Sequence, residues 1–262
     1  MSARRERWLG LGLEVTVPIL VLVVWGLMSA GSKTFYFPPL TDILSTFRKT
    51  WLFHRVGSDA VPSLLRMGAG FGIAVVGGVT LGLLLGLSPR GRRAAAPIIE
   101  FLRAIPPPAL LPFAILVVGV GASMKIFIIG FVCVWPILLN TIDGVRGVEP
   151  TLEETARVYR IPERDRVWRV MLPAASPQVF AGMRTSLSLA LILMVISEMV
   201  ASTNGIGYFV LQSQRTFAIP EMWSGIILLG ILGYTLNGAF VLIERRVLRW
   251  HRGARASALS GG

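Results

Sequence analysis

Long apolar stretches without charged residues dominate the pattern of this chain. Five contain no Asp, Glu, Lys or Arg, at 15–32, 67–89, 104–124, 126–142 and 222–243, and a sixth, at 179–201, is interrupted only by Arg184 and Glu198. A helix needs about 20 residues to cross the roughly 30 Å hydrocarbon core of a bilayer. The pattern therefore predicts an all-α integral membrane protein, with one domain over 1–262 and six transmembrane helices at about 11–31, 64–88, 97–119, 123–143, 179–201 and 222–244.

The first apolar run has a second interpretation. Arg4, Arg5 and Arg7 precede it and small residues at 29–31 follow it, as in a cleaved signal peptide. The uncharged run is longer than the apolar region of a usual signal peptide, and five further runs follow it. We therefore expect an uncleaved first helix.

Composition excludes several classes of protein. The chain is 53% apolar and only 15% charged, with a mean hydropathy of +0.67. A water-soluble enzyme, a secreted disulfide scaffold and a nucleic-acid binder do not fit these values, even though the net charge is +12. The single cysteine, Cys133, supports neither an intramolecular disulfide nor a cysteine-based metal cluster.

The basic residues are distributed unevenly between the two sides of the predicted membrane. If the six spans alternate and the N-terminus is inside, 17 basic residues fall on the inner side and six on the outer side. Inner loops carry the excess of Lys and Arg in membrane proteins. The distribution predicts a multi-pass protein of the plasma membrane with both termini in the cytoplasm.

Glycines mark the second predicted span. Lipid gives apolar helices no hydrophobic reason to associate, so close packing depends on small residues. The pairs Gly68 and Gly72, Gly78 and Gly82, and Gly82 and Gly86 have the required four-residue spacing. They predict helix packing within the subunit or, alternatively, an interface between subunits.

Prolines mark the third predicted span. Pro106, Pro107, Pro108 and Pro112 remove four backbone donors and predict a bent or broken helix. Broken helices are tolerated inside a membrane where they are buried in protein or line a cavity. The cluster is therefore either part of a pathway or an ordinary kink.

Among the ionisable residues of the predicted spans, we single out Glu100, Arg103, Arg184 and Glu198. A charge at the centre of a membrane helix costs about 2.5–3.5 kcal/mol by insertion scales, so these residues should face protein or water. Glu198 lies deepest, and we expect Glu198 and Arg103 to line or support a translocation pathway. Glu100 and Arg103 are spaced to pair with each other, and Arg184 is expected to reach the membrane surface.

The charged loop at 144–178 has the features of a helix pair. Thr151 and Glu154 have the spacing of a capping box, so a first helix is expected to start there and to end before Pro162. A second helix is expected to follow and to stop at Pro173. Such a pair would project into the cytoplasm and suits the docking of a soluble partner.

The segment from Glu154 to Pro173 resembles the EAA loop of permease subunits of bacterial ABC importers, whose pattern is E-A-A, three residues, G, then I-x-L-P. It departs from this pattern at Thr155 and at Arg160, where the family has glycine. The chain further resembles the branch that imports nitrate, taurine, alkanesulfonates and thiamine-precursor pyrimidines. The residues that carry this resemblance are Phe37-Pro38-Pro39, Leu102-Arg103-Ala104-Ile105-Pro106, Leu111-Pro112, Ser197-Glu198-Met199 and Asn204-Gly205-Ile206-Gly207-Tyr208.

The resemblance implies a homodimer of six-helix permeases that works with a cytoplasmic ABC ATPase dimer and an extracytoplasmic solute-binding protein. It implies an ATPase contact through Glu154, Thr155, Ala156, Tyr159, Arg160, Ile161, Leu172 and Pro173. It also implies a translocation pathway that includes Arg103, Pro106, Glu198 and Asn204. The family's glycine would adopt a positive φ. With Arg160 in its place, we expect Ile161-Pro162 to make the turn and Arg160 to contact the partner or a nearby acidic residue.

ATP chemistry is expected to come from another subunit. A Walker A loop needs a Gly-Lys pair, but the lysines Lys33, Lys49 and Lys125 do not follow glycine. We therefore expect no enzymatic activity and no cofactor on this chain, with ATP and Mg²⁺ on the partner ATPases. An intramembrane transferase is a rival hypothesis that would require clustered carboxylates or histidines within the spans, and a passive channel would need no docking helix pair.

The identity of the solute is the least determined property. Arg103 could attract an anion such as nitrate, a sulfonate or a taurine-like compound, and we rank small anions first. A neutral heterocycle, such as a thiamine-precursor pyrimidine or a flavin, is the second hypothesis.

Overall fold

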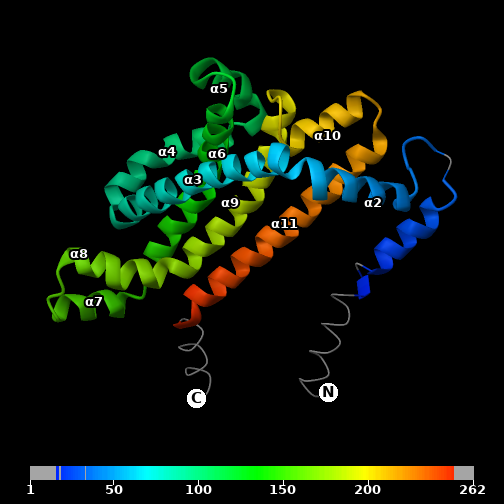
Figure 1. Cartoon of the computed structure of the whole chain (residues 1–262). Helices are drawn as coiled ribbons and strands as arrows, with labels where there is room; N and C mark the ends of the chain where they lie inside the picture. The colour runs from blue at the N-terminus through cyan, green and yellow to red at the C-terminus, as the bar shows by residue number, and fades with distance from the viewer. Residues whose placement is uncertain (1–15, 18, 33, 251–262) are drawn as a thin grey trace, which may run out of the picture.

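The computed structural model of the protein describes residues 16–17, 19–32 and 34–250, and this part of the chain is helical without strands (Figure 1). Four uninterrupted helices are long and apolar enough to cross a membrane, at Val56–Leu87, Ala122–Arg146, Glu163–Val200 and Ile219–Val247. A bent pair adds a fifth crossing if it is counted as one span. The all-α membrane fold is thus confirmed. Of the first predicted span, the structure describes residues 16–17 and 19–31, which include the apolar helix Ile19–Ser29, whereas Arg4, Arg5 and Arg7 lie outside the described residues.

The elements after this first helix follow one another with short connections. They are α2 (Leu40–Lys49), η1 (Thr50–His54), η2 (Val56–Ala60), α3 (Val61–Leu87), α4 (Pro89–Ala104), η3 (Pro107–Ala109), α5 (Leu110–Val118), α6 (Ala122–Arg146), α7 (Pro150–Val158), α8 (Glu163–Asp165), η4 (Arg166–Met171), α9 (Leu172–Val200), α10 (Ile206–Arg215) and α11 (Ile219–Val247).

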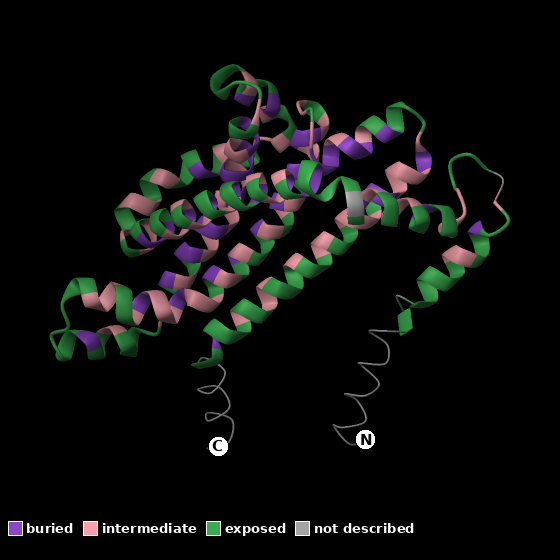
Figure 2. Cartoon of the chain, in the orientation of Figure 1, coloured by how far each residue is buried: buried purple, intermediate pink, exposed green. Residues whose placement is uncertain are grey.

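The core of the bundle is built around α6. This helix packs against both α3 and α9, and its residues Ile128, Ile129, Cys133 and Ile137 are buried in the main apolar cluster. By contrast, no residue in the most apolar window of α11 is buried, and Figure 2 shows α11 mostly in the colours of exposed and intermediate residues. Because exposed apolar surface is unfavourable in water, this face of α11 is suited to lipid or to another chain.

Glycines let α3 approach α6 closely. A Cβ added at Gly82 would lie 2.5 Å from Cβ of Thr141, and one added at Gly78 would lie 2.8 Å from Cβ of Ile137. Gly86 is similarly close to Val145. The prediction of packing within the subunit is therefore confirmed for these three glycines. It is wrong for the other pair, because a Cβ at Gly68 or Gly72 would meet nothing within 4 Å.

The third predicted span is broken at its prolines. Helix α4 ends at Ala104, Ile105 is extended with ψ of 122°, and the two halves of the pair meet at 83°. Proline disfavours the helical conformation of the residue before it and lacks an N–H, so Pro106 ends α4. The predicted break is confirmed.

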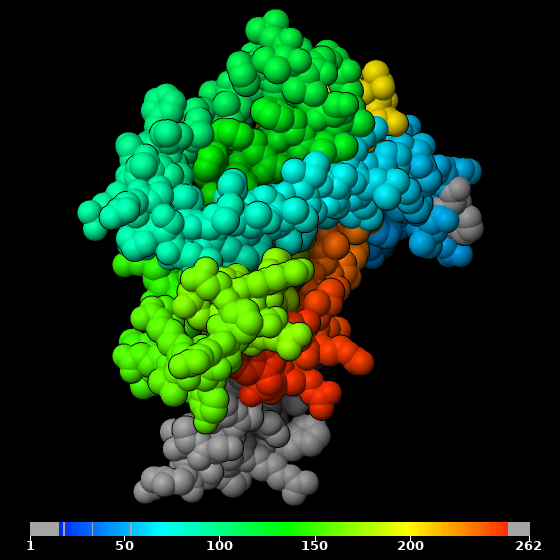
Figure 3. Space-filling view, turned by 90° about the vertical axis from the view of Figure 1, so that its left-hand side faces the viewer, coloured from blue at the N-terminus to red at the C-terminus, as the bar shows by residue number. Residues whose placement is uncertain are grey.

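The bundle has two distinct ends, which we call the α7 end and the α10 end. Helices α7 and α8 lie at one end of the molecule, and α5 and α10 lie at the other (Figure 1). In the space-filling view of Figure 3, the residues of α7 to η4 lie at the lower end and those of α5 at the upper end.

The predicted helix pair exists at the α7 end, but its boundaries differ from the expectation. Helix α7 begins at Pro150 with Glu149 as N-cap and has no side-chain cap, so the predicted capping box at Thr151 is wrong. Proline suits the first helical position because its φ is already helical and no N–H is needed there.

The second helix of the pair does not stop at Pro173. The helical segment runs from Glu163 through the π-helical turn η4 into α9 and ends at Val200, over 38 residues. Pro173 directly follows the π-helical turn η4, and the helix continues past it in spite of the missing N–H. The projecting loop is therefore joined to a membrane helix without a break.

Candidate functional site

The turn after α7 is made by Arg160, contrary to the expectation for Ile161-Pro162. Arg160 has φ of 51°. The amide of Arg160 donates to the carbonyl of Arg157 at 2.9 Å, and the amide of Ile161 donates to that of Ala156 at 3.0 Å. These two bonds form a Schellman motif, which ends a helix with a residue of positive φ and usually has glycine there. Arg160 thus adopts the conformation expected of the family's glycine.

An exposed face surrounds this turn, which we call the coupling surface: Glu154, Thr155, Val158, Tyr159, Arg160 and Trp168. Tyr159 is 77% exposed, an unusual position for an aromatic side chain without a partner. Ala156 is only 2% exposed, so the expectation that it contacts a partner directly is wrong. Ile161 borders the surface, and Leu172 and Pro173 are half-buried at its junction with α9.

A second group of functional side chains lies buried at the α10 end. We call it the polar cluster; it consists of Asp59, Ser63, Arg66, Lys125, Glu198, Ser202 and Asn204. These residues come from η2, α3, α6, the end of α9 and the short segment before α10.

Glu198 is fully enclosed in this cluster, with 0% of its surface exposed. Oε1 of its carboxylate accepts the hydroxyl of Ser63 at 2.7 Å and Nη1 of Arg66 at 3.2 Å. Oε2 accepts the amide of Gly207 at 3.0 Å. Nη2 of Arg66 also donates to Oδ1 of Asn204 at 2.8 Å. Removing one partner of a buried ion pair destabilises a protein by about 3–5 kcal/mol, because the other charge stays buried without compensation.

The cluster also caps α10. The amide of Gly205 donates to Oδ1 of Asp59 at 2.8 Å, and the amide of Ile206 donates to the Ser63 hydroxyl at 3.0 Å. The first amides of α10 therefore receive acceptors, which a helix N-terminus requires. Gly205 has φ of 118°, and an added Cβ there would collide with the Glu198 carboxylate. The sequence Asn204-Gly205 thus allows the chain to pass directly over a buried charge.

Lys125 completes the cluster from α6. Its Nζ donates to Oγ of Ser202 at 2.7 Å, and only 3% of the residue is exposed. The Ser202 hydroxyl in turn contacts the carbonyl of Asn204. Lys125 lies near the start of the fourth predicted span, and the structure places it in the first turn of α6.

The other predicted pathway residues lie apart from the polar cluster. Arg103 is in the last turn of α4, beside the break at Pro106, and its side chain is 47% exposed. Nε of Arg103 donates to Oε2 of Glu100 at 2.8 Å, so the expected pairing of these two residues is found. Arg184 pairs with Glu244 of α11, and the expectation that it reaches the membrane surface stays a prediction. That Arg103, Pro106, Glu198 and Asn204 line a pathway stays a prediction.

Sequence reasoning missed five members of the cluster: Asp59, Ser63, Arg66, Lys125 and Ser202. Ser63 and Arg66 are three residues apart, so they share a helix face, and Arg66 and Lys125 each directly flank an uncharged run. Both signals are also typical of residues at the membrane surface, so they do not reveal burial. The described residues hold no group of His, Cys, Asp or Glu side chains placed to bind a metal ion.

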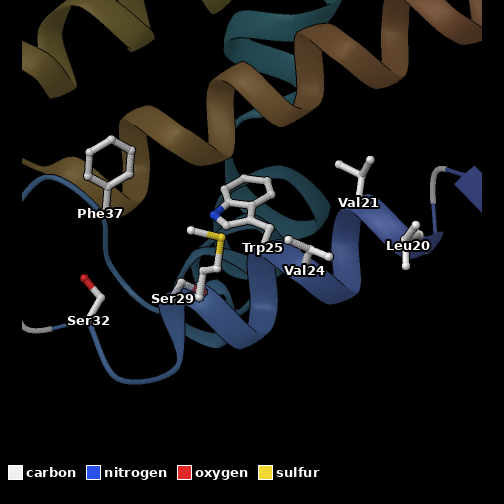
Figure 4. A pocket seen from close by; sticks show the side chains of 8 residues that line it. Leu20, Val21, Val24, Trp25, Ser29, Ser32 and Phe37 are labelled. Atoms are coloured by element: carbon white, nitrogen blue, oxygen red, sulfur yellow. The ribbon is translucent and has the colours of Figure 1, made fainter.

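A cavity of about 600 Å³ borders the first helix and has a different character. Figure 4 shows Val21, Val24 and Trp25 on this helix and Phe37 on the segment that follows, with hydroxyls only from Ser29 and Ser32. Among the described residues that line it, none has an ionisable side chain. This apolar cavity is therefore not a candidate for handling a charged ligand.

Sequence comparisons place this geometry in context. The pattern of the family described as "Binding-protein-dependent transport system inner membrane component" matches residues 78–249. The chain is 30% identical over 237 residues to a putative aliphatic sulfonates transport permease protein of Bacillus subtilis, covering 89% of this chain and 86% of that protein. It is 30% identical to a nitrate import permease protein of Synechocystis, covering 87% and 86%. It is 29% identical to a bicarbonate transport system permease protein of Synechococcus elongatus, covering 94% and 92%.

Solved structures give a similar picture of the fold. The chain resembles a chain of the MetNI methionine ABC transporter in an inward-facing conformation, with a TM-score of 0.66 and 21% identity. The match covers 76% of this chain and 97% of that chain.

Proposed function

The chain belongs to the family of inner membrane components of binding-protein-dependent transport systems and is a permease subunit of an ABC importer, and we propose that the solute it imports is a small anion. As a member of this family it is a multi-pass protein of the inner membrane. The ATPase of such an importer is a separate subunit, and a solute-binding protein is a further partner.

The observation that carries the anion proposal is the set of solutes in the names of the relatives. Aliphatic sulfonates, nitrate and bicarbonate are all small anions, and these relatives match along more than four fifths of both chains.

We propose the following assembly around the chain. Two copies form a homodimer, the α7 end and both termini face the cytoplasm, and an ATPase dimer docks there. The α10 end faces the solute-binding protein. ATP and Mg²⁺ are held by the ATPases, and this chain has no catalytic activity and binds no cofactor or nucleic acid. The excess of arginine in the segments at the α7 end supports this orientation.

The coupling surface is proposed to transmit ATPase movement to the membrane helices. The observation that supports this proposal is that α8, η4 and α9 form one helical segment from Glu163 to Val200. A displacement of the segment near Trp168 therefore acts directly on the helix that carries Glu198. Glu154, Thr155, Tyr159, Arg160 and Ile161 would contact the ATPase, with Ala156 supporting them from behind and Leu172 and Pro173 at the junction. The predicted pathway residues Arg103, Pro106, Glu198 and Asn204 lie toward the α10 end of this route.

Uptake by the complete complex tests the anion proposal. The permease, its ATPase and its solute-binding protein are reconstituted in proteoliposomes, and uptake of nitrate, bicarbonate, taurine and an alkanesulfonate is compared with uptake of a thiamine-precursor pyrimidine and of riboflavin. We expect saturable, ATP-dependent uptake of at least one anion and none of the two heterocycles. Uptake of a heterocycle alone would contradict the proposal and favour the second hypothesis.

A further inference from the structure

With Arg55, which borders the polar cluster, three cations face the two carboxylates of the cluster. Asp59 pairs with Arg55 at 3.2 Å, and Glu198 pairs with Arg66 at 3.2 Å. Lys125 is the remaining charge, and among the described residues no carboxylate lies within ion-pair distance of its ammonium group. Its recorded hydrogen bond is to the neutral hydroxyl of Ser202. One positive charge is therefore left over.

The nearby carboxylates are already occupied. Glu198 attracts Lys125 electrostatically, but its oxygens accept from Ser63, Arg66 and Gly207, and Arg66 repels Lys125. The carboxylates of Asp59 and Glu198 also accept hydrogen bonds from amides at the start of α10. If either carboxylate turned toward Lys125, the amide that it accepts from would lose its acceptor.

An isolated buried ammonium is costly, and it has unused hydrogen-bonding capacity. An ammonium group carries three donors, and Ser202 accepts only one of them. The positive end of the α6 dipole, at Ala122, makes a cation in the first turn less favourable still. Charged residues inside membrane segments that persist at such a cost usually belong to a substrate or ion pathway.

The cover over Lys125 is thin. It is formed by the short segment between α9 and α10, in which Ser202 and Asn204 are half-buried and Thr203 is exposed. Displacing the Ser202 hydroxyl would therefore open the ammonium to the surface of the α10 end. Arg103 differs from Lys125 in charge balance and in burial. Glu100 neutralises the charge of Arg103, and the side chain of Arg103 is exposed.

We propose that Lys125 is an anion-contacting residue of the translocation pathway, where a small oxyanion exchanges with the Ser202 hydroxyl on the Lys125 ammonium. This inference rests on the proposed function, since it assumes an anionic solute. It assigns Glu198 and Arg66 a positioning role, in which they hold the segment 202–205 over Lys125.

Uptake and stability of matched variants test this role in the reconstituted complex. Lys125→Gln removes the charge at similar length, Lys125→Arg keeps it, and Lys49→Gln is a control at an exposed lysine of α2. We expect Lys125→Gln to lower the rate of anion uptake at least tenfold, Lys125→Arg to retain most of it, and Lys49→Gln to match the parent.

Thermal unfolding of the same purified variants separates this role from a structural one. Because Lys125 has no carboxylate partner, Lys125→Gln should unfold at the parental temperature or above, whereas Glu198→Gln should unfold at a lower temperature. Parental uptake by a stable Lys125→Gln variant would overturn the inference. So would a destabilised Lys125→Gln variant, since that result would make Lys125 a structural member of the cluster.

The parental complex is measured first, so failure of the premise is recognised separately. If it imports a neutral heterocycle and no anion, the proposed function fails and this inference falls with it. If it imports an anion, the comparison of the Lys125 variants alone decides the inference.

Discussion

Arg160 illustrates how a single residue keeps a conformation that its side chain disfavours. Its φ of 51° belongs to the left-handed region, which costs a residue with a Cβ roughly 1–2 kcal/mol. The two Schellman hydrogen bonds at Arg157 and Ala156 hold the turn nevertheless. An arginine on this exposed turn adds a charge to the coupling surface that glycine would not provide.

Replacing Arg160 by glycine should therefore stabilise the turn. We expect Arg160→Gly to slow hydrogen exchange of the amides at 160 and 161, with a net gain of up to about 1 kcal/mol after the added chain entropy of glycine. Arg164→Gly, at a residue of α8 without a positive φ, is the matched control and should not slow exchange. Equal or faster exchange in Arg160→Gly would show that the arginine itself stabilises the turn.

The contact between α3 and α6 is determined at the scale of the element. Gly78, Gly82 and Gly86 recur every four residues and meet a ridge of side chains on α6 that includes Thr141. Close packing of this kind stabilises the contact between helices in lipid, where the hydrophobic effect does not bring apolar helices together.

A pair of alanine substitutions on α3 tests this contact. Gly82→Ala places a Cβ 2.5 Å from Cβ of Thr141 and should destabilise the permease by about 1–3 kcal/mol, the usual cost of overpacking. Gly72→Ala adds a methyl group with nothing within 4 Å and should be neutral or slightly stabilising. Thermal unfolding in detergent compares the two variants with the parent, and equal unfolding temperatures would contradict a close contact at Gly82.

The proposed coupling belongs to the scale of the whole molecule, because it would join the coupling surface at the α7 end to the polar cluster at the α10 end. Helix α9 is the direct connection, with the coupling surface before its first turn and Glu198 near its last. Exposed aromatic residues such as Tyr159 and Trp168 are typical energetic centres of protein interfaces.

Changes at the coupling surface should therefore impair the complex without unfolding the permease. We expect Tyr159→Ala to weaken ATPase binding by about 2 kcal/mol or more, and Glu154→Lys to reduce solute-stimulated ATP hydrolysis. Lys49→Gln, a change in α2 away from the coupling surface, should leave ATPase binding and solute-stimulated ATP hydrolysis unchanged. Co-purification and ATPase stimulation measure the two effects. Parental binding and transport in both variants would exclude this loop as the coupling element.

The helical organisation of the chain could be predicted from local pattern alone. Burial in a membrane selects long uncharged runs, so hydropathy located α3, α6, α9 and α11, and the prolines at 106–108 located the break. The loop between α6 and α9 was recognisable from its charge and its motif. Its details were not, because the choice between a capping box at Thr151 and proline at the first helical position depends on small differences in local energy.

Only the tertiary structure decided which polar residues act together. Asp59, Arg66, Lys125 and Glu198 come from four elements, and each has an ordinary neighbourhood in the sequence. The same hydropathy value describes an arginine at the membrane surface and one that is bonded to a buried carboxylate, since burial depends on which helices meet. The pairing of Glu198 with Arg66, and the absence of such a partner for Lys125 among the described residues, arise when α3, α6 and α9 pack together.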